Sequence, residues 1–95
     1  METLDERLRD SGFEWAVPTW HRRYVRNRPD GWELVQFIDG RVSVSLNVLA
    51  VGDMSRWFPP TVTIEEIEAF IARARRVIAE WDTCEISFTT PSILS

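Results

Sequence analysis

The chain of 95 residues contains one cysteine, one histidine and no lysine, and each scarcity excludes a class of site. Because Cys84 is the only cysteine, an internal disulfide and a four-cysteine zinc site are both impossible, which agrees with a reducing cytoplasm. Without lysine there is no Walker-type phosphate loop. The sequence also lacks an apolar run of about 18 residues and the basic and apolar segments of a signal peptide. We therefore expect a cytoplasmic protein that does not span a membrane.

Few residues remain as candidates for catalysis. His21 and Cys84 could form a dyad in which the imidazole activates the thiol. Cys84, however, falls in an apolar alternation with Ile86 and Phe88, where a cysteine is usually an inert core residue. The adjacent carboxylates at residues 65–66 open a helix, and helix capping explains them. No paired cysteine or histidine spacing indicates a metal site, so we expect no enzymatic activity, no metal and no cofactor.

The composition is that of one folded domain over residues 1–95, with a frayed tail over residues 90–95. Hydrophobic residues make up 44% of the chain and charged residues 27%, which are ordinary proportions for a globular protein. This length allows a single core. All eleven basic residues are arginine, which hints at a GC-rich source. The net charge of −4 disfavours a general nucleic-acid binder, because such proteins need a surplus of positive charge.

Hydrophobic periodicity and turn residues predict the element order α-β-β-β-α-β. Thr3 and Glu6 form a capping box at the start of a short helix, and Pro18 confines any extended piece before it to a sheet edge. We expect a helix over residues 4–10, an extended piece over 13–17, strands over 20–28, 32–39 and 41–51, a loop over 52–62, a helix over 64–81 and a last strand over 84–89. The predicted fold class is α+β: a three- to four-stranded antiparallel sheet with one long amphipathic helix packed on one face and a short N-terminal helix.

A hairpin and the long helix carry the strongest signals. Asp39-Gly40 lies between two alternating runs, and a two-residue primed turn needs residues that tolerate positive φ. This turn sets two pairs opposite each other on the core face: Phe37 with Val42, and Val35 with Val44. The apolar residues of the helix fall within an arc of roughly 140°, with every Glu and Arg outside it: Ile64, Ile67, Phe70, Ile71, Ala74, Val77, Ile78 and Trp81.

A Trp-led strand over residues 32–38, Asp39-Gly40-Arg41, a Val-Ser-Val segment over residues 42–44, and Thr63-Ile64-Glu65-Glu66 before an Ala/Arg-rich helix follow one another over about half of the chain. In this order they resemble the small orphan hairpin-helix proteins of actinobacteria and their phages. The long aromatic loop over residues 52–62 departs from the compact form of that pattern. The resemblance implies a phage or mobile-element origin and no particular activity.

Two apolar groups are candidates for contact with a partner. On the sheet face opposite the helix, Trp32, Leu34 and Ile38 occupy positions where polar residues are the rule. Their cover is the N-terminal segment, a second copy of the chain or a foreign protein. In the predicted loop, Met54, Trp57 and Phe58 are residue types that dominate interfaces, and the two prolines that follow stiffen them. They could equally cap the end of the core.

The only dense basic run lies on the first predicted strand. Its candidate residues for an anionic partner are Trp20, Arg22, Arg23, Tyr24, Arg26 and Arg28. Arginines can grip phosphates while aromatic rings stack on bases. The same arginines could instead protect an edge strand from aggregation and pair with nearby acids, and an acidic patch on a protein would suit them as well as nucleic acid.

The favoured hypothesis is a non-enzymatic protein-interaction module, encoded by a phage or mobile element, that binds a host protein. We expect it to be a homodimer that assembles through the sheet face or an edge strand. The alternative is a nucleic-acid-binding regulator that uses residues 20–28. Salt distinguishes the two hypotheses, because phosphate contacts weaken steeply as the salt concentration rises and apolar contacts do not.

Overall fold

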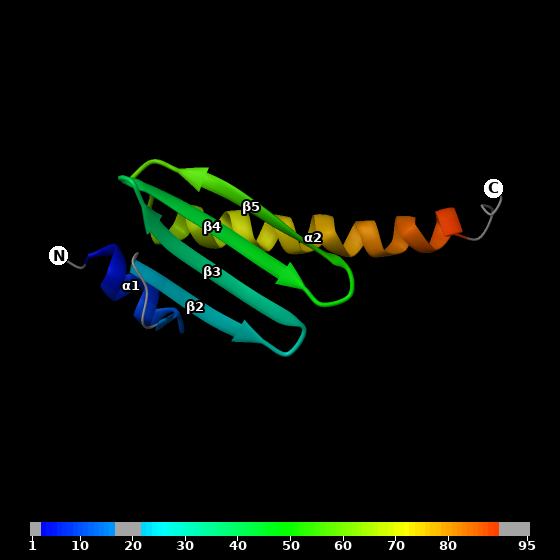
Figure 1. Cartoon of the computed structure of the whole chain (residues 1–95), viewed down its shortest axis with the longest axis horizontal. Coiled ribbons are helices and arrows are strands. Elements are labelled where there is room, and N and C mark those ends of the chain that lie inside the picture. The colour runs from blue at the N-terminus through cyan, green and yellow to red at the C-terminus, as the bar shows by residue number, and fades with distance from the viewer. Residues whose placement is uncertain (1–2, 17–21, 90–95) are drawn as a thin grey trace.

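The computed structural model describes residues 3–16 and 22–89, and from residue 82 onward it describes the backbone alone. Within these residues the elements are α1 (Leu4–Asp10), β1 (Glu14–Trp15), β2 (Arg22–Arg28), β3 (Gly31–Ile38), β4 (Arg41–Val48), β5 (Gly52–Phe58) and α2 (Ile64–Thr89) (Figure 1). The strands form one antiparallel sheet in the order β1-β2-β3-β4-β5. The predicted α+β class is confirmed, whereas the prediction of three to four strands falls short of the five present.

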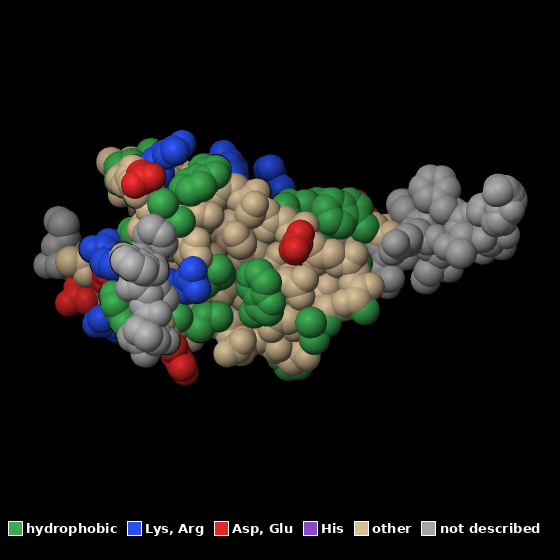
Figure 2. Space-filling view, viewed as in Figure 1, with side chains coloured by type: hydrophobic (Ala, Val, Ile, Leu, Met, Phe, Trp, Pro, Cys, Tyr) green, Lys and Arg blue, Asp and Glu red, His purple; other side chains and the backbone are tan. Residues whose placement is uncertain are grey.

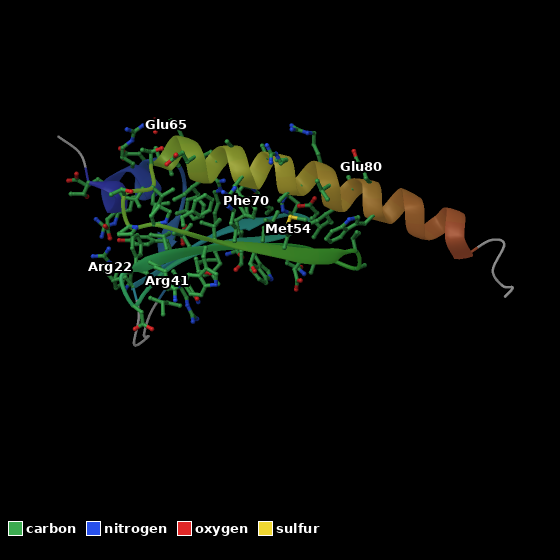
Figure 3. The ribbon with its side chains drawn as sticks, turned by 90° about the horizontal axis from the view of Figure 1, so that it is seen from above. Arg22, Arg41, Met54, Glu65, Phe70 and Glu80 are labelled. Carbon is green, nitrogen blue, oxygen red and sulfur yellow. The ribbon has the colours of Figure 1, made fainter. Side chains whose placement is uncertain are left out.

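The domain has two layers, with the helices on one side of the sheet. Figure 1 shows α2 running behind the strands, and Figure 3 shows both helices above the sheet when the molecule is turned. α2 projects well beyond the end of the strands, so the molecule is elongated, with extents of 55 × 25 × 24 Å. No helix in the described part of the chain is both long and apolar enough to cross a membrane.

The predicted hairpin is present with the predicted register. Asp39 and Gly40 both take positive φ, at 51° and 72°, as a primed two-residue turn requires. The two predicted cross-strand pairs, Phe37 with Val42 and Val35 with Val44, lie opposite each other. The turn thus decides which residues of β3 and β4 face the helix.

The core fills the space between the sheet and α2. Its buried apolar residues include Val35, Val42, Val44 and Leu46 from the sheet and Ile64, Ile67, Ile71, Ala74 and Ile78 from α2. All of the helical members belong to the predicted apolar arc. Full burial of one such aliphatic side chain contributes roughly 1.5–3 kcal/mol to folding, so this face holds α2 on the sheet.

The N-terminal helix is held by its cap, by a buried leucine and by a side-chain hydrogen bond to β2. Thr3 and Glu6 form the predicted capping box, and Leu8 is fully buried. Tyr24 donates a hydrogen bond of 2.6 Å from its hydroxyl to Asp5. α1 therefore closes one end of the core and is linked to β2 by a buried phenol.

The prediction of a loop over residues 52–62 is wrong for its first part, which forms β5. Met54 and Phe58 pair with core-facing residues of β4, while Trp57 pairs with outward-facing Ser43. This alternation is that of a strand, and the prolines that suggested a loop follow its last residue. β4 accordingly ends at Val48 rather than at residue 51.

The prediction of a last strand over residues 84–89 is also wrong, because α2 continues to Thr89. Asp82 and Thr83, which lie between the predicted helix and the predicted strand, are within the helix. A formed helix gains one hydrogen bond for each residue added, whereas a strand must find a partner. The place beside β4 that a returning strand could take is already held by β5.

Candidate interaction surface

The side of the sheet opposite the helices is the first candidate surface, and we call it the open face. Strand register places on it Arg23, Val25, Asn27, Trp32, Leu34, Gln36, Ile38, Arg41, Ser43, Ser45, Asn47, Asp53, Ser55 and Trp57. All of these residues are exposed or half-buried, and no described element packs over them. Figure 2 shows this face, on which hydrophobic side chains lie among polar and backbone atoms.

The apolar part of the open face brings two predicted groups together. Trp32, Leu34 and Ile38 lie along β3 with Gln36 between the last two, and each of the three is half-buried. Val25 of β2 lies opposite Leu34 and extends the apolar line sideways. Trp57 of β5 is 50% exposed on the same face, so one residue of the predicted loop joins the sheet group.

The other two residues predicted as contacts in that segment belong to the core. Phe58 is buried, and its ring meets Phe70 of α2 edge-on with the centroids 5.8 Å apart. Met54 packs on the cluster around Leu46 and Ile78, and Figure 3 shows it between the sheet and the helix. Their side chains hold α2 in place, and neither lies on the open face.

Charge on the open face is divided between its two ends. Arg41, beside the β3–β4 turn, holds its guanidinium 4.8 Å from the centre of the Trp57 ring. Arg23 lies toward the same end of the face as Arg41. When the Gln36 amide is oriented with its oxygen toward Arg23, that oxygen accepts two hydrogen bonds of 2.9 Å from the Arg23 guanidinium. Asp53 lies opposite Asn47 toward the other end. Across β2 to β5 the face is therefore basic at one end and acidic at the other.

Most of the predicted arginine strand faces α2 instead of a partner. Glu33 of β3 has no exposed surface, and its carboxylate accepts hydrogen bonds from three arginines. The distances are 2.6 Å from Arg26, 3.2 Å from Arg28 and 3.4 Å from Arg75 of α2. Arg75 also donates to both carboxylate oxygens of Asp30 at 2.7 Å. These bonds connect β2, β3 and α2 inside the fold.

Arg26 is the most buried of these arginines, with a side chain that is only 11% exposed. Its two terminal nitrogens donate to Glu68 at 2.8 and 3.0 Å, and one of them also reaches the carbonyl of Ser11. Its guanidinium lies 4.3 Å from the centre of the Phe13 ring. Burial by itself lowers the pKa of Arg26, but the hydrogen bonds to Glu68 and Glu33 outweigh it and raise that pKa.

The remaining members of the predicted anion-binding set are dispersed. Arg22 stacks on Phe37 at 4.1 Å and lies 3.6 Å from Asp5. Tyr24 is buried, and Trp20 lies outside the described residues. Among the described arginines of β2, Arg23 is the one that reaches the open face. The six residues therefore do not form one surface.

The Glu33 cluster was not predicted, although the sequence contains a signal for it. Val35 and Phe37 were assigned to the core, and a period of two puts Glu33 on the same side of the strand. An acid at a core-facing position needs a cation, and Arg26 and Arg28 have the matching alternation on the neighbouring strand. The signal was therefore an acidic residue, Glu33, at a core-facing position of the strand, where an apolar residue is expected.

A second candidate surface lies beside β5, at the edge of the sheet. No described strand pairs with the outer side of β5. A groove of about 530 Å³ separates this edge from α2, and Arg56, Phe58, Glu66, Ala69, Phe70 and Arg73 are among its lining residues. In Figure 2 basic side chains gather along the margin that β5 forms. The groove is thus open, partly apolar and flanked by cations.

Both side chains of the considered Cys-His dyad lie outside the described part of the structure. His21 lies outside the described residues, as does the side chain of Cys84, whose backbone belongs to α2 and not to a strand of the sheet. In the described part of the chain, no group of three or more His, Cys, Asp or Glu side chains could hold a metal ion. Every buried polar side-chain atom there has a hydrogen-bond partner.

No family model matches the chain, and comparisons with curated proteins and with solved structures find no match either. The function is therefore inferred from the two surfaces described above.

Proposed function

We propose that this chain is a non-enzymatic protein-interaction module that pairs with a second copy of itself through the open face. The observation that carries the proposal is the line of Trp32, Leu34 and Ile38 on a sheet face over which no described element packs. A solvated sheet face normally carries polar residues at such positions. Apolar groups left in contact with water in this way are typical of an interaction surface.

The basic and acidic ends of the open face favour a second copy of the chain as the partner that packs on it. When two open faces meet about a two-fold axis that runs across the strands, the end with Arg41 in each copy lies over the end with Asp53 in the other. The same axis sets Ile38 against Trp32 of the second copy, since these residues lie at opposite ends of β3. Sheets pack face to face within about 30° of each other, and complementary charge fixes their orientation.

The size of the open face predicts a reversible dimer. The strands β2 to β5 span roughly 19 Å across and 26 Å along at ordinary strand spacings, which places the contact toward the small end of specific interfaces. Nine of the fourteen residues named on this face are polar or charged. We therefore expect a dissociation constant on the order of micromolar.

Sedimentation at a series of concentrations tests this contact. Ile38→Ser should weaken dimerisation about tenfold by removing an apolar contact with Trp32 of the second copy, while the melting temperature changes little. Leu49→Ser is the matched control, because Leu49 is 60% exposed in the turn after β4 and lies off the open face. If the unmodified protein stays monomeric at about 100 μM, a hundredfold above the expected dissociation constant, the dimer is refuted.

A charge exchange tests the orientation of the two copies. Arg41→Asp and Asp53→Arg should each weaken the homodimer, because each puts like charges at both ends of the contact. In an equimolar mixture of the two variants, each altered residue faces its opposite and the heterodimer should recover. Failure of the mixture to associate, with both variants folded, would argue against the proposed axis.

The nucleic-acid alternative draws less support from the geometry. Arg26 and Arg28 are engaged by Glu33, and Arg26 also by Glu68. A regulator that gripped several phosphates would lose affinity steeply with salt, whereas the apolar contact proposed here should change little. Capture of a host protein by a phage-encoded chain stays a prediction.

A further inference from the structure

The two edges of the sheet are protected unequally. β1 has two residues and is too short to recruit another strand, whereas β5 has seven residues and no proline within them. No described strand lies beyond β5. Proteins usually protect a long edge by cover or by shortening it, because its free amide and carbonyl groups pair readily with another chain. β5 is thus available for strand addition.

The groove beside β5 offers a place for the side chains of an added strand. The rings of Phe58 and Phe70 form its apolar part, with centroids 5.8 Å apart. Ala69 on the neighbouring turn of α2 is small and exposed, so the helix leaves room there. The volume of about 530 Å³ falls within the range of roughly 300–1,000 Å³ that is typical of ligand sites.

The charges at the groove select the kind of strand. Arg56 and Arg73 line it from β5 and α2, and in the described part of the chain neither forms an ion pair. Arg56 lies 4.8 Å from the centre of the Phe58 ring, so its cation is held over the groove. The carboxylate of Glu66 accepts a hydrogen bond of 2.9 Å from the Thr63 backbone amide and is committed to capping α2.

We propose that β5 binds an extended acidic segment of a partner protein, which adds to the sheet as a further antiparallel or parallel strand. Apolar side chains at alternate positions enter the groove at Phe70, and one Glu or Asp lies between Arg56 and Arg73. Backbone hydrogen bonds supply the affinity and the alternate side chains supply the specificity. The net charge of −4 does not oppose this contact, because charges beyond about 8 Å are screened at physiological salt.

This inference rests on the proposed function as a protein-interaction module, and it is tested with a defined peptide pool. The peptides are blocked at both ends and about eight residues long, enough to pair with all of β5. β-branched residues alternate with Ser or Thr, and one central position is Glu. We expect the backbone amide NMR signals of β5 and of Ala69 to Arg73 to shift. A pool with Gln at the central position should bind about tenfold more weakly.

Two sets of variants test the details. The double change Arg56→Gln and Arg73→Gln should bring the affinity for the Glu pool down to that of the Gln pool. Arg76→Gln is the matched control, because Arg76 is exposed on α2 outside the lining of the groove. N-methylation of alternate peptide amides should abolish binding in one of the two possible series and spare it in the other, since one edge of the peptide faces β5.

The inference is overturned if the Glu pool leaves the β5 amides unmoved or if both N-methylated series bind equally. It is also overturned if β5 amides become protected with rising protein concentration in the absence of peptide, because a second copy would then occupy the edge. Sedimentation of the same samples separates this result from the dimer contact. A dimer that forms in the unmodified protein while the Glu pool fails to bind it removes this inference alone.

Discussion

At the scale of single residues, Glu33 is the most constrained group in the described structure. Its carboxylate is completely buried, and an ion of this kind loses several kcal/mol of hydration when it leaves water. Three arginines and three acids offset that cost within one neutral cluster: Arg26, Arg28 and Arg75 with Glu33, Glu68 and Asp30. The cluster also decides which way β2 presents its arginines.

Glu33→Gln should destabilise the protein by about 3–5 kcal/mol, because it leaves the buried Arg26 without its closest counter-charge. Urea unfolding followed by tryptophan fluorescence measures the loss. Glu80→Gln is the matched control, since Glu80 is exposed on the outer side of α2 (Figure 3) and should change stability by less than about 0.5 kcal/mol. Equal stabilities for the two variants would mean that the cluster contributes nothing net.

Tyr24 should titrate above its ordinary range. Burial raises the pKa of its phenol above the ordinary value of 10.0, and the hydrogen bond to Asp5 raises it further. A folded state that holds its proton more tightly gains stability that is fully present below pH 10 and is lost as the pH rises beyond it. Because Tyr24 is the only tyrosine, tyrosinate absorbance reports it alone.

The expected midpoint for Tyr24 lies above that of the urea-unfolded chain, and Asp5→Asn should lower it. Tyr24→Phe should remove the alkaline loss of stability that this group causes. A native midpoint equal to the unfolded one would show that the phenol is not held as described.

At the scale of elements, two glycines set the hairpins in different ways. Gly40 takes a positive φ of 72°, and an added Cβ would meet nothing within 4 Å. Gly31 begins β3 so close to β4 that an added Cβ would lie 1.8 Å from the carbonyl oxygen of Asn47. Gly40 is therefore required only for its backbone conformation, whereas Gly31 is required because the backbone of β4 lies too close for a side chain.

Gly40→Ala should therefore cost about 1–2 kcal/mol, the ordinary penalty for a left-handed alanine. Gly31→Ala should cost clearly more, because the backbone of β4 must move and the pairing of β3 with β4 is disturbed. Thermal unfolding of both variants, with circular dichroism to verify the sheet, compares them directly. A Gly31→Ala protein at least as stable as Gly40→Ala would contradict this arrangement.

At the scale of the whole molecule, exposed ion pairs join segments far apart in the sequence. Arg75 of α2 binds Asp30 in the β2–β3 turn, and Arg7 of α1 contacts Glu65 at the start of α2. The hydrogen bonds and charge of Arg75 lower the pKa of Asp30. The backbone amide at the start of α2 lowers the pKa of Glu65, and Arg7 adds to that effect.

These two carboxylates should make the domain sensitive to acid. A carboxyl whose pKa is lowered on folding stabilises the protein above its unfolded pKa, and this stability is lost as the pH falls through the folded value. We expect stability to decline below about pH 4. Asp30→Asn should flatten the decline measured by urea unfolding from about pH 5 to pH 2. A curve identical to that of the unmodified protein would show that the Asp30–Arg75 pair contributes nothing.

The sequence by itself determined the features that depend on a few neighbouring residues. Asp39-Gly40 specifies a primed turn and thereby the register of β3 and β4, while Thr3 and Thr63 cap the two helices through Glu6 and Glu66. The apolar arc of α2 likewise predicts which side of the helix is buried. Turns and helix caps depend on two to four neighbouring residues. Hydrophobic periodicity assigns residues to the buried or exposed side within one helix or strand, so the sequence shows all of these features.

Only the tertiary structure decided the features that depend on distant partners. Short alternations are compatible with strand, loop or helix, and packing made residues 52–58 a strand and residues 84–89 a helix. Glu68 and Arg75 each reach their partners on β2 and β3 across 42 residues of sequence, so the sequence could not show that the arginine strand faces inward. The orientation of Trp57 toward the open face, with Phe58 in the core, follows from its pairing with β4. Burial and ion pairing depend on what the fold brings into contact, and local sequence does not specify that.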